Sequence, residues 1–260
     1  MHTPILQSVF PGTPPWQSER NLPGLRRIDP ADWLIRDTAF GAQMALRDRL
    51  VADRAHDVLA CLPGAEPAAR ECLALVLGHL KADPGYRMGT ASVTRPDGVP
   101  VTLGKAAPMA TLARLVQSDI CILHPGEGGH VLTAAALCFP ASWTLAEKLG
   151  QPMDRIHDPV AAYDTGLARR VQRIFDQLRP GHVIARSNLL LYDDPDLYQP
   201  RSETAPRDPV GSEAAGFIRS ERQTLRTLPE SGAVVFGIHT IVMRRADLPR
   251  DDQRAIMEAH

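Results

Sequence analysis

The sequence lacks several features that would assign it to a protein class at once. It contains no run of about 18 apolar residues, so no membrane-spanning helix is predicted. Its first residues show no basic stretch followed by an apolar one, which predicts no secretory signal and favours a cytoplasmic location. Its four cysteines form no Cys-x-x-Cys pair, and three of them lie in apolar or helical surroundings typical of small buried side chains.

A strong net charge is also missing. The 29 basic and 30 acidic residues give a formal charge of −1, which argues against nucleic acid or an anionic membrane as the main partner. The motifs GxGxxG, GxxxxGK[ST], HExxH and GxSxG, which mark common nucleotide sites, zinc proteases and serine hydrolases, do not occur. Any catalytic site must therefore be built from less generic features.

The patterns that are present predict an α+β fold with an antiparallel sheet. Residues 1–30 are rich in proline and are predicted to form an extended arm, followed by a single domain over residues 31–260. Apolar spacing predicts helices from near Thr38, from near Pro67 and after Asp164, and slightly favours a helix over 217–228. Apolar runs at 120–123 and 131–137 predict a hairpin, and 182–191 and 233–243 are predicted strands. Because helices and strands do not alternate regularly, a doubly wound parallel sheet is disfavoured.

His157 is the first candidate for chemistry. It follows Gly150 and Pro152 in what is predicted to be an irregular segment, where the backbone can direct an imidazole. It could ligate a metal or a haem, or it could be a structural histidine that bonds to nearby backbone. A haem iron needs only one protein ligand, so a solitary histidine is compatible with the first interpretation.

A row of arginines is the second candidate. On a helix, Arg219, Arg222 and Arg226 would share one face, where guanidinium groups could bind carboxylates with Glu221 orienting one of them. The alternative is a solvated charged face with local ion pairs. His239 lies within an apolar predicted strand, where it is either a pocket residue or a hydrogen-bonded core histidine.

Several segments together resemble the family of haem-dependent oxidative N-demethylases, represented by the haem subunit of dimethylamine monooxygenase. The resemblance is carried by Cys138-Phe139-Pro140-Ala141-Ser142-Trp143, by Glu147-Lys148-Leu149-Gly150-Gln151-Pro152, and by Ile156-His157-Asp158-Pro159-Val160. It continues in Arg186-Ser187-Asn188 and in Glu221-Arg222-Gln223-Thr224-Leu225, and it extends over most of residues 24–243 in order.

This resemblance implies a PAS-like antiparallel sheet flanked by helices, with an N-terminal helical segment and a haem b held against the sheet. It implies His157 as the iron ligand, with propionates bound by Arg219 and Arg222 and by Arg186 as a further candidate. Trp143 would pack beneath the cofactor or in the core. The implied reaction is a monooxygenase-type oxidative demethylation of a small amine, using O2 and electrons from a flavin and iron–sulfur reductase.

Departures from the family pattern leave the substrate open. The segment after His157 continues Ala161-Ala162-Tyr163 where the family has Pro-Gly-Tyr, and the last strand carries His239 where an arginine is usual. His239, Tyr163 and Glu221 are therefore the candidate residues around the substrate, if His239 faces the haem. The alternative function is a haem-binding sensor or carrier with a PAS-like fold and no turnover.

Overall fold

One wide antiparallel sheet organises the molecule. The computed structural model describes residues 3–17, 24–104, 106–127, 129–157, 165–208, 210–211 and 213–258. In spatial order the strands are β1 (Arg26–Ile28), β8 (Val183–Ser187), β10 (Phe217–Thr227), β11 (Val234–Arg244), β6 (Asp119–Gly126), β7 (Gly129–Ala136) and β2 (Leu59–Cys61), with β9 (Leu190–Tyr192) beside β10. Every pairing between these strands is antiparallel.

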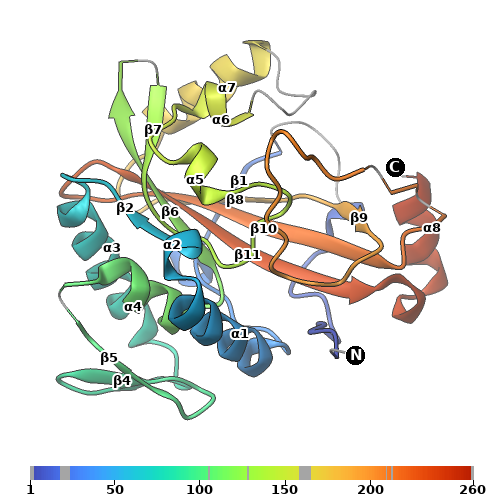
Figure 1. The fold of residues 1–260 in the computed structure, drawn as a ribbon, viewed down its shortest axis with the longest axis horizontal. Helices are drawn as coiled ribbons and strands as arrows, with labels where there is room; N and C mark the ends of the chain where they lie inside the picture. Colours follow the sequence, from blue (N-terminus) through green and yellow to red (C-terminus); the bar gives the residue numbers. More distant parts are fainter. Residues whose placement is uncertain are drawn as a thin grey trace.

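Helices cover both faces of this sheet (Figure 1). One face carries α1 (Phe40–Asp53), α2 (Ala55–Val58), α3 (Glu66–Leu80) and α4 (Pro108–Leu115), and we call it the α3 face. The other carries α5 (Leu145–Lys148), α6 (Met153–His157) and α7 (Thr165–Gln177), and we call it the α7 face. Short 3-10 turns η1 (Pro15–Gln17), η2 (Pro30–Asp32) and η3 (Arg245–Asp247), and the last helix α8 (Arg250–Glu258), complete the main body.

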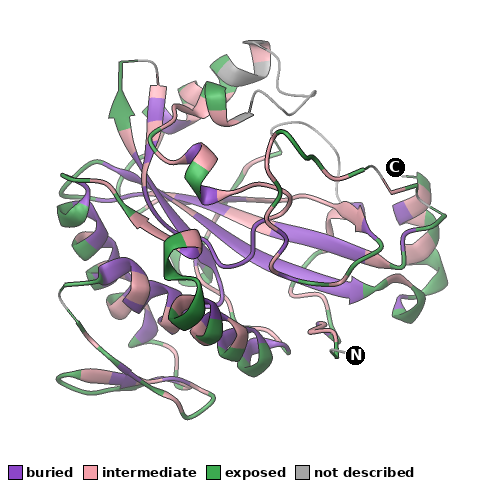
Figure 2. Cartoon of the chain, in the orientation of Figure 1, coloured by how far each residue is buried: buried purple, intermediate pink, exposed green. Residues whose placement is uncertain are grey.

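The local sequence explains the helices of the α3 face. Proline occupies the first turns of α3 and α4, where its fixed φ suits a helix and no hydrogen bond is lost. Helix α3 then buries a stripe of small and apolar side chains against the sheet and α4: Ala68, Ala69, Cys72, Leu73, Val76 and Leu80. Figure 2 shows the long central strands and the inner sides of these helices as the buried part of the molecule. The predicted helices from near Thr38, from near Pro67 and after Asp164 are confirmed.

The N-terminal arm lies against the sheet in its described part. The backbone N–H of Gln7 donates to the Val242 carbonyl at 2.9 Å, and the Gln7 side-chain oxygen accepts from the Val242 N–H at 2.8 Å. Trp16 packs beside Ile218 of β10 and Ile241 of β11, at the end of this strand pair that contacts α8. The arm is thus fixed to β11 over residues 3–17.

Two elements differ from the sequence predictions, and a small sheet was not predicted. Residues 217–228 are not a helix: Phe217–Thr227 is the strand β10, paired on both sides with other strands. His157 is the last residue of the helix α6 and does not lie in an irregular segment. The connection after α3 contains a small separate sheet of β3 (Arg87–Met88), β4 (Ser92–Thr94) and β5 (Pro100–Thr102).

The predicted hairpin at 120–137 and the predicted strand at 233–243 are confirmed as β6–β7 and β11. The predicted strand at 182–191 is divided between β8 and β9. Within the described part of the chain, no helix combines the length and the apolar character needed to cross a bilayer.

Candidate functional site

The α7 face carries an apolar cluster that is only partly closed. Its buried members are Cys121, Leu123, Leu132, Ala135, Leu137, Leu145, Phe175, Leu225 and Val234. Trp143, Met153, Ile156, Ile184 and Phe236 pack against them while keeping part of their surface accessible. Partly exposed large apolar side chains from the sheet, from α6 and from the segment before α5 form a surface that suits a flat apolar group.

The strand register places polar groups next to this cluster. Ile184, Leu225 and Phe236 form one row of directly paired residues across β8, β10 and β11. The next row on the same face holds Arg186 and Gln223. Residues two apart along a strand share a face and are about 7 Å apart. The guanidinium of Arg186 therefore stands at the edge of an apolar surface.

Arg186 has donors that nothing in the described part of the chain uses. Its guanidinium forms no hydrogen bond or ion pair with the described residues. Burial lowers the pKa of Arg186, and the nearby charge of Glu221 opposes that effect only in part. A half-buried guanidinium with free donors is a natural partner for a carboxylate, which it can bind in a bidentate manner.

Glu221 is held rigidly beside Arg186. Its carboxylate accepts from the side-chain amides of Asn188 at 3.0 Å and of Gln223 at 3.2 Å. Its backbone N–H donates to the side-chain oxygen of Asn188 at 2.7 Å, and the Asn188 N–H donates to the Glu221 carbonyl at 3.1 Å. Glu221 is 7% exposed, so this clamp fixes a negative charge close to the surface of the site.

The segment that carries Trp143 is anchored at both ends. Asp119 accepts the backbone N–H groups of Cys138 at 2.7 Å and of Phe139 at 2.9 Å. Ser142 has a φ of 63°, a left-handed conformation that is uncommon without glycine, and its N–H donates to the Gln199 carbonyl at 3.0 Å. Such backbone strain persists only where surrounding contacts maintain it. The residue that follows Ser142 is Trp143, whose side chain packs against the cluster.

Helix α6 is held in place by a buried lysine. Lys148 is 4% exposed and donates to the Ile156 carbonyl at 2.8 Å and to Glu203 at 2.6 Å. Arg155 also pairs with Glu203 at 2.8 Å. These bonds fix the last turn of α6, in which Ile156 packs against the cluster. The backbone of His157, the next residue, is therefore held close to the cluster. The structure describes the backbone of His157 but not its side chain, and Tyr163 lies outside the described residues.

The arginine row does not share one face. In the strand β10, alternation puts Arg219 on the same side as Glu221 and Gln223, whereas Arg222 and Arg226 point to the α3 face. Arg219 is 1% exposed and donates to the carbonyls of Phe139 at 2.7 Å and Leu197 at 3.2 Å. Its donors tie β10 to two loops, so Arg186 is better placed than Arg219 to bind a carboxylate.

Arg222 has a comparable anchoring role on the opposite face. It donates to the carbonyls of Asp32 at 2.6 Å and Trp33 at 3.1 Å, which fixes η2 to the sheet. The prediction that Arg219 and Arg222 share one face of a helix is therefore wrong, because both lie in the strand β10 and point to opposite faces of the sheet.

His239 also faces away from the α7 cluster. It is directly paired with Arg222 and is 1% exposed. Its Nε2 lies 2.8 Å from Oδ2 of Asp37, which also accepts from the Gln7 side chain, while Oδ1 of Asp37 accepts from the Gln117 side chain. Of the two interpretations from the sequence, the hydrogen-bonded core histidine fits this environment.

The Asp37–His239 pair gives a pH prediction. Burial opposes ionisation of Asp37, but the hydrogen bond and charge of His239, with Gln117 and Gln7, outweigh it and hold the pKa of Asp37 below its usual value. A depressed carboxylate pKa contributes stability above about pH 4, and that stability is lost as the pH falls through the folded-state pKa. Asp37→Asn should lower the free energy of unfolding by about 1–3 kcal/mol at pH 7.

Urea unfolding from pH 7 down to pH 3 tests this expectation. The difference between the wild type and Asp37→Asn should narrow as the pH falls through the usual range of a carboxyl pKa, because the carboxylate of the unfolded wild type takes up a proton before that of the folded protein does. A difference that stays constant over that range would contradict the assignment of the stabilisation to the ionised carboxylate.

The α7 face thus combines a partly accessible apolar surface, a guanidinium without partners among the described residues, and a helix whose last residue is a histidine. Residues 24–259 match the family described as haem-dependent oxidative N-demethylase, alpha subunit-like. The chain belongs to this family, which is one of haem-dependent oxidoreductases, and the resemblance seen in the sequence is confirmed.

The described residues fit a haem. Arg186 offers unused donors for a propionate, and Trp143, Ile184 and Phe236 offer accessible apolar surface for a porphyrin. No three His, Cys, Asp or Glu side chains among the described residues gather to chelate a metal ion. A porphyrin iron needs only one protein ligand, so it does not depend on such a group.

Sequence reasoning missed two supporting residues. Lys148 was visible only as part of the family motif Glu-Lys-x-Gly-x-Pro, and its bond to Ile156 depends on the fold. Asn188 was likewise part of a motif, and its clamp on Glu221 forms only once β10 is a strand.

Proposed function

We propose that this chain is a haem monooxygenase that oxidatively demethylates, or carries out a related oxidation of, a small amine-like substrate. The haem is haem b, held on the α7 face, with His157 as the iron ligand. The observation that carries this proposal is the guanidinium of Arg186, which has no partner among the described residues and lies beside the partly accessible apolar cluster under α6. Family membership supplies the haem dependence.

The residues of this chain have separate tasks in the proposed site. When bound, the haem supplies the activation of O2 and the oxidising power. His157 ligates the iron, and the Lys148 bond to Ile156 keeps the end of α6 in position. Arg186 binds a propionate. Trp143, Ile184 and Phe236 pack on the porphyrin and exclude water from one side.

Glu221 suits a cationic substrate. An aliphatic amine is protonated near neutral pH, and a fixed carboxylate raises the local concentration of a cation. Asn188 and Gln223 both donate to Oε2, while Oε1 accepts no hydrogen bond from the described residues and lies 4.0 Å from Nε of Arg219. We therefore assign Glu221 to substrate attraction and orientation, with Tyr163 as the further candidate.

The remaining parts of the proposal concern partners and surroundings. Electrons come from a separate flavin and iron–sulfur reductase, the location is cytoplasmic, and the sheet with its helices corresponds to a PAS-like haem domain. Consumption of O2 and reductant by the haem-loaded protein, measured with and without dimethylamine or related methylamines, tests turnover. Haem binding without any amine-dependent consumption would favour the sensor or carrier function instead.

The role of Arg186 can be tested by haem binding alone. Arg186→Gln should weaken the binding of haem to the haem-free protein by about 10- to 100-fold, because charge-assisted hydrogen bonds to a carboxylate are lost. Absorbance titration measures the affinity. Arg26→Gln is the matched control, since Arg26 is exposed and lies on the neighbouring strand β1.

The dimethyl ester of haem sharpens this test. It lacks the propionate charges, so the wild type should bind it more weakly than haem, and Arg186→Gln should cause no further loss. An equal loss for haem and for its ester would show that Arg186 acts on the fold and not on a propionate.

A further inference from the structure

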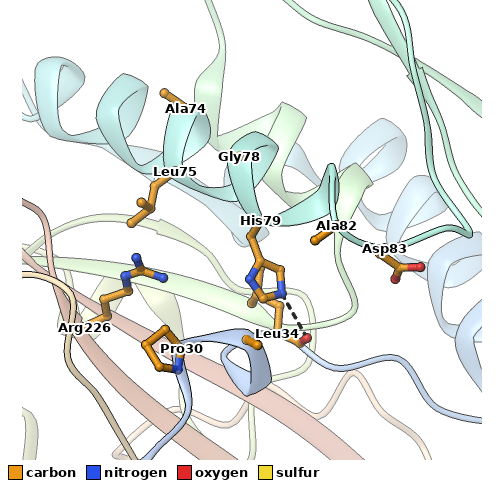
Figure 3. A pocket seen from close by; sticks show the side chains of 10 residues that line it. Pro30, Leu34, Ala74, Leu75, Gly78, His79, Ala82, Asp83 and Arg226 are labelled. Atoms are coloured by element: carbon orange, nitrogen blue, oxygen red, sulfur yellow. Dashed lines mark hydrogen bonds between the residues drawn. The ribbon is translucent and has the colours of Figure 1, made fainter.

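A hollow of about 610 Å³ lies on the α3 face, between η2, α3 and β10. Its walls are mainly apolar and come from Pro30, Ala31, Leu34, Ala74, Leu75, Gly78 and Ala82, with His79, Asp83 and Arg226 as the polar members. This volume falls in the range of small-molecule sites. Figure 3 shows Arg226 entering from the strand and His79 from the helix, on either side of the space.

Arg226 is fixed but unpaired. Its guanidinium lies over the ring of Trp33, 4.6 Å from the ring centroid, which orients it from one side. Its Nε is buried without a hydrogen-bond partner, and the group forms no ion pair within the described part of the chain. Burial lowers the pKa of Arg226, so the charge is held where solvent stabilises it poorly. An anion in the hollow would bind the terminal amino groups of this guanidinium, which form no hydrogen bond with the described residues.

The other polar groups limit what that anion can be. Asp83 is already paired with Arg36 at 2.6 Å and accepts the Gly85 N–H. His79 donates Nε2–H to the Leu34 carbonyl at 3.3 Å, and burial lowers its pKa, which keeps the ring neutral. Among the described lining residues, Arg226 is thus the one free cation.

We propose that this hollow is a second binding site, for a small monocarboxylate with an apolar body. One guanidinium matches one negative charge, and the alanine, leucine and proline walls match an alkyl or aryl group. A phosphate or a dianion would need further donors that the described lining does not supply. The site lies on the opposite sheet face from Arg186 and Glu221 and does not depend on the function proposed for that face.

Calorimetric titration of the haem-loaded protein tests the proposal, and Arg186→Gln, titrated alongside, shows whether any of the binding comes from Arg186. Hexanoate is the probe, with hexanamide as its uncharged counterpart and inorganic phosphate as the alternative anion. We expect saturable binding of hexanoate, with hexanamide and phosphate at least about 10-fold weaker. Arg226→Gln should weaken hexanoate binding by about 10-fold or more.

A second pair of variants keeps Arg226 in place. A Cβ on Gly78 would meet no atom within 4 Å, so a side chain at this helical position projects into open space. Gly78→Phe should fill the hollow and abolish hexanoate binding, whereas Gly78→Ala should retain it. Unchanged binding in Arg226→Gln or in Gly78→Phe would overturn the proposal. Loss of haem from Arg226→Gln would overturn it too, since the hollow would then belong to the haem site.

Discussion

Haem titration of the His157→Gly protein is expected to show at least about a 100-fold loss of affinity and an altered Soret band. The estimate follows from the 10- to 100-fold effects of removing groups that merely orient a metal ligand, since removal of the ligand itself must cost more. Added imidazole should enter the space left by the side chain and restore the wild-type absorption spectrum. This rescue separates ligation from a general loss of structure.

His130→Gly is the matched control for this experiment. His130 lies on β7, its ring centroid is 4.8 Å from that of Phe175 in α7, and it is 5% exposed, so it belongs to the same region as α6. We expect it to keep its haem. Loss of haem in His130→Gly with normal binding in His157→Gly would move the iron ligand from α6 to β7.

Asp119→Ala is expected to produce the largest loss of stability, about 3–5 kcal/mol in the free energy of unfolding. The side chains of Asp119 and Arg47 are both 0% exposed and are joined at 2.6 Å. Arg47 also donates to the carbonyls of Ala113 at 2.8 Å and Gln117 at 3.1 Å. Removal of the carboxylate leaves a buried guanidinium without its counter-charge.

The same carboxylate also anchors the start of the segment that carries Trp143. It accepts the N–H groups of Cys138 and Phe139, which begin the segment that leads to Trp143. Asp119→Ala should therefore also weaken haem binding in whatever fraction remains folded. Urea unfolding followed by circular dichroism measures the stability, and absorbance titration measures the binding.

Two further variants separate charge from packing. Asp251→Ala removes an exposed partner of Arg254 and should change stability by less than about 0.5 kcal/mol. The double variant Arg47→Met with Asp119→Ala should be less destabilised than Asp119→Ala alone, because no unpaired charge remains. A double variant at least as unstable as the single one would show that the pair acts through packing and not through charge.

The helices α1, α3 and α7 and the β6–β7 hairpin could be predicted from the sequence because their signals are local. Apolar spacing marks α1, α3 and α7, a proline in the first turn also marks α3, and β-branched residues mark β11. The helix expected at 217–228 failed because this segment contains arginine, glutamate, glutamine and leucine, which favour helices. Its neighbours in the sheet, which override that preference, are distant in the sequence or lie beyond a turn.

The site was predictable only in part, for the same reason. The Arg186–Ser187–Asn188 and Glu221 segments were noticed through their resemblance to a family, and the strand register now brings Arg186 and Glu221 close together. The partner of His239 is Asp37, 202 positions away along the chain, and no local pattern indicates such a pair. The face to which each arginine of β10 points could not be known while the segment was taken for a helix.

The central claim is that the haem binds on the α7 face, against α6 and the rows of Ile184 and Arg186. Hydrogen–deuterium exchange of the haem-free and haem-loaded protein, followed by mass spectrometry, tests it most directly. We predict that haem slows exchange in peptides from α6, α7 and β8, while peptides from α3 and η2 keep their rates. Slower exchange in α3 and η2, with α6 and α7 unchanged, would place the haem on the opposite face and contradict the account.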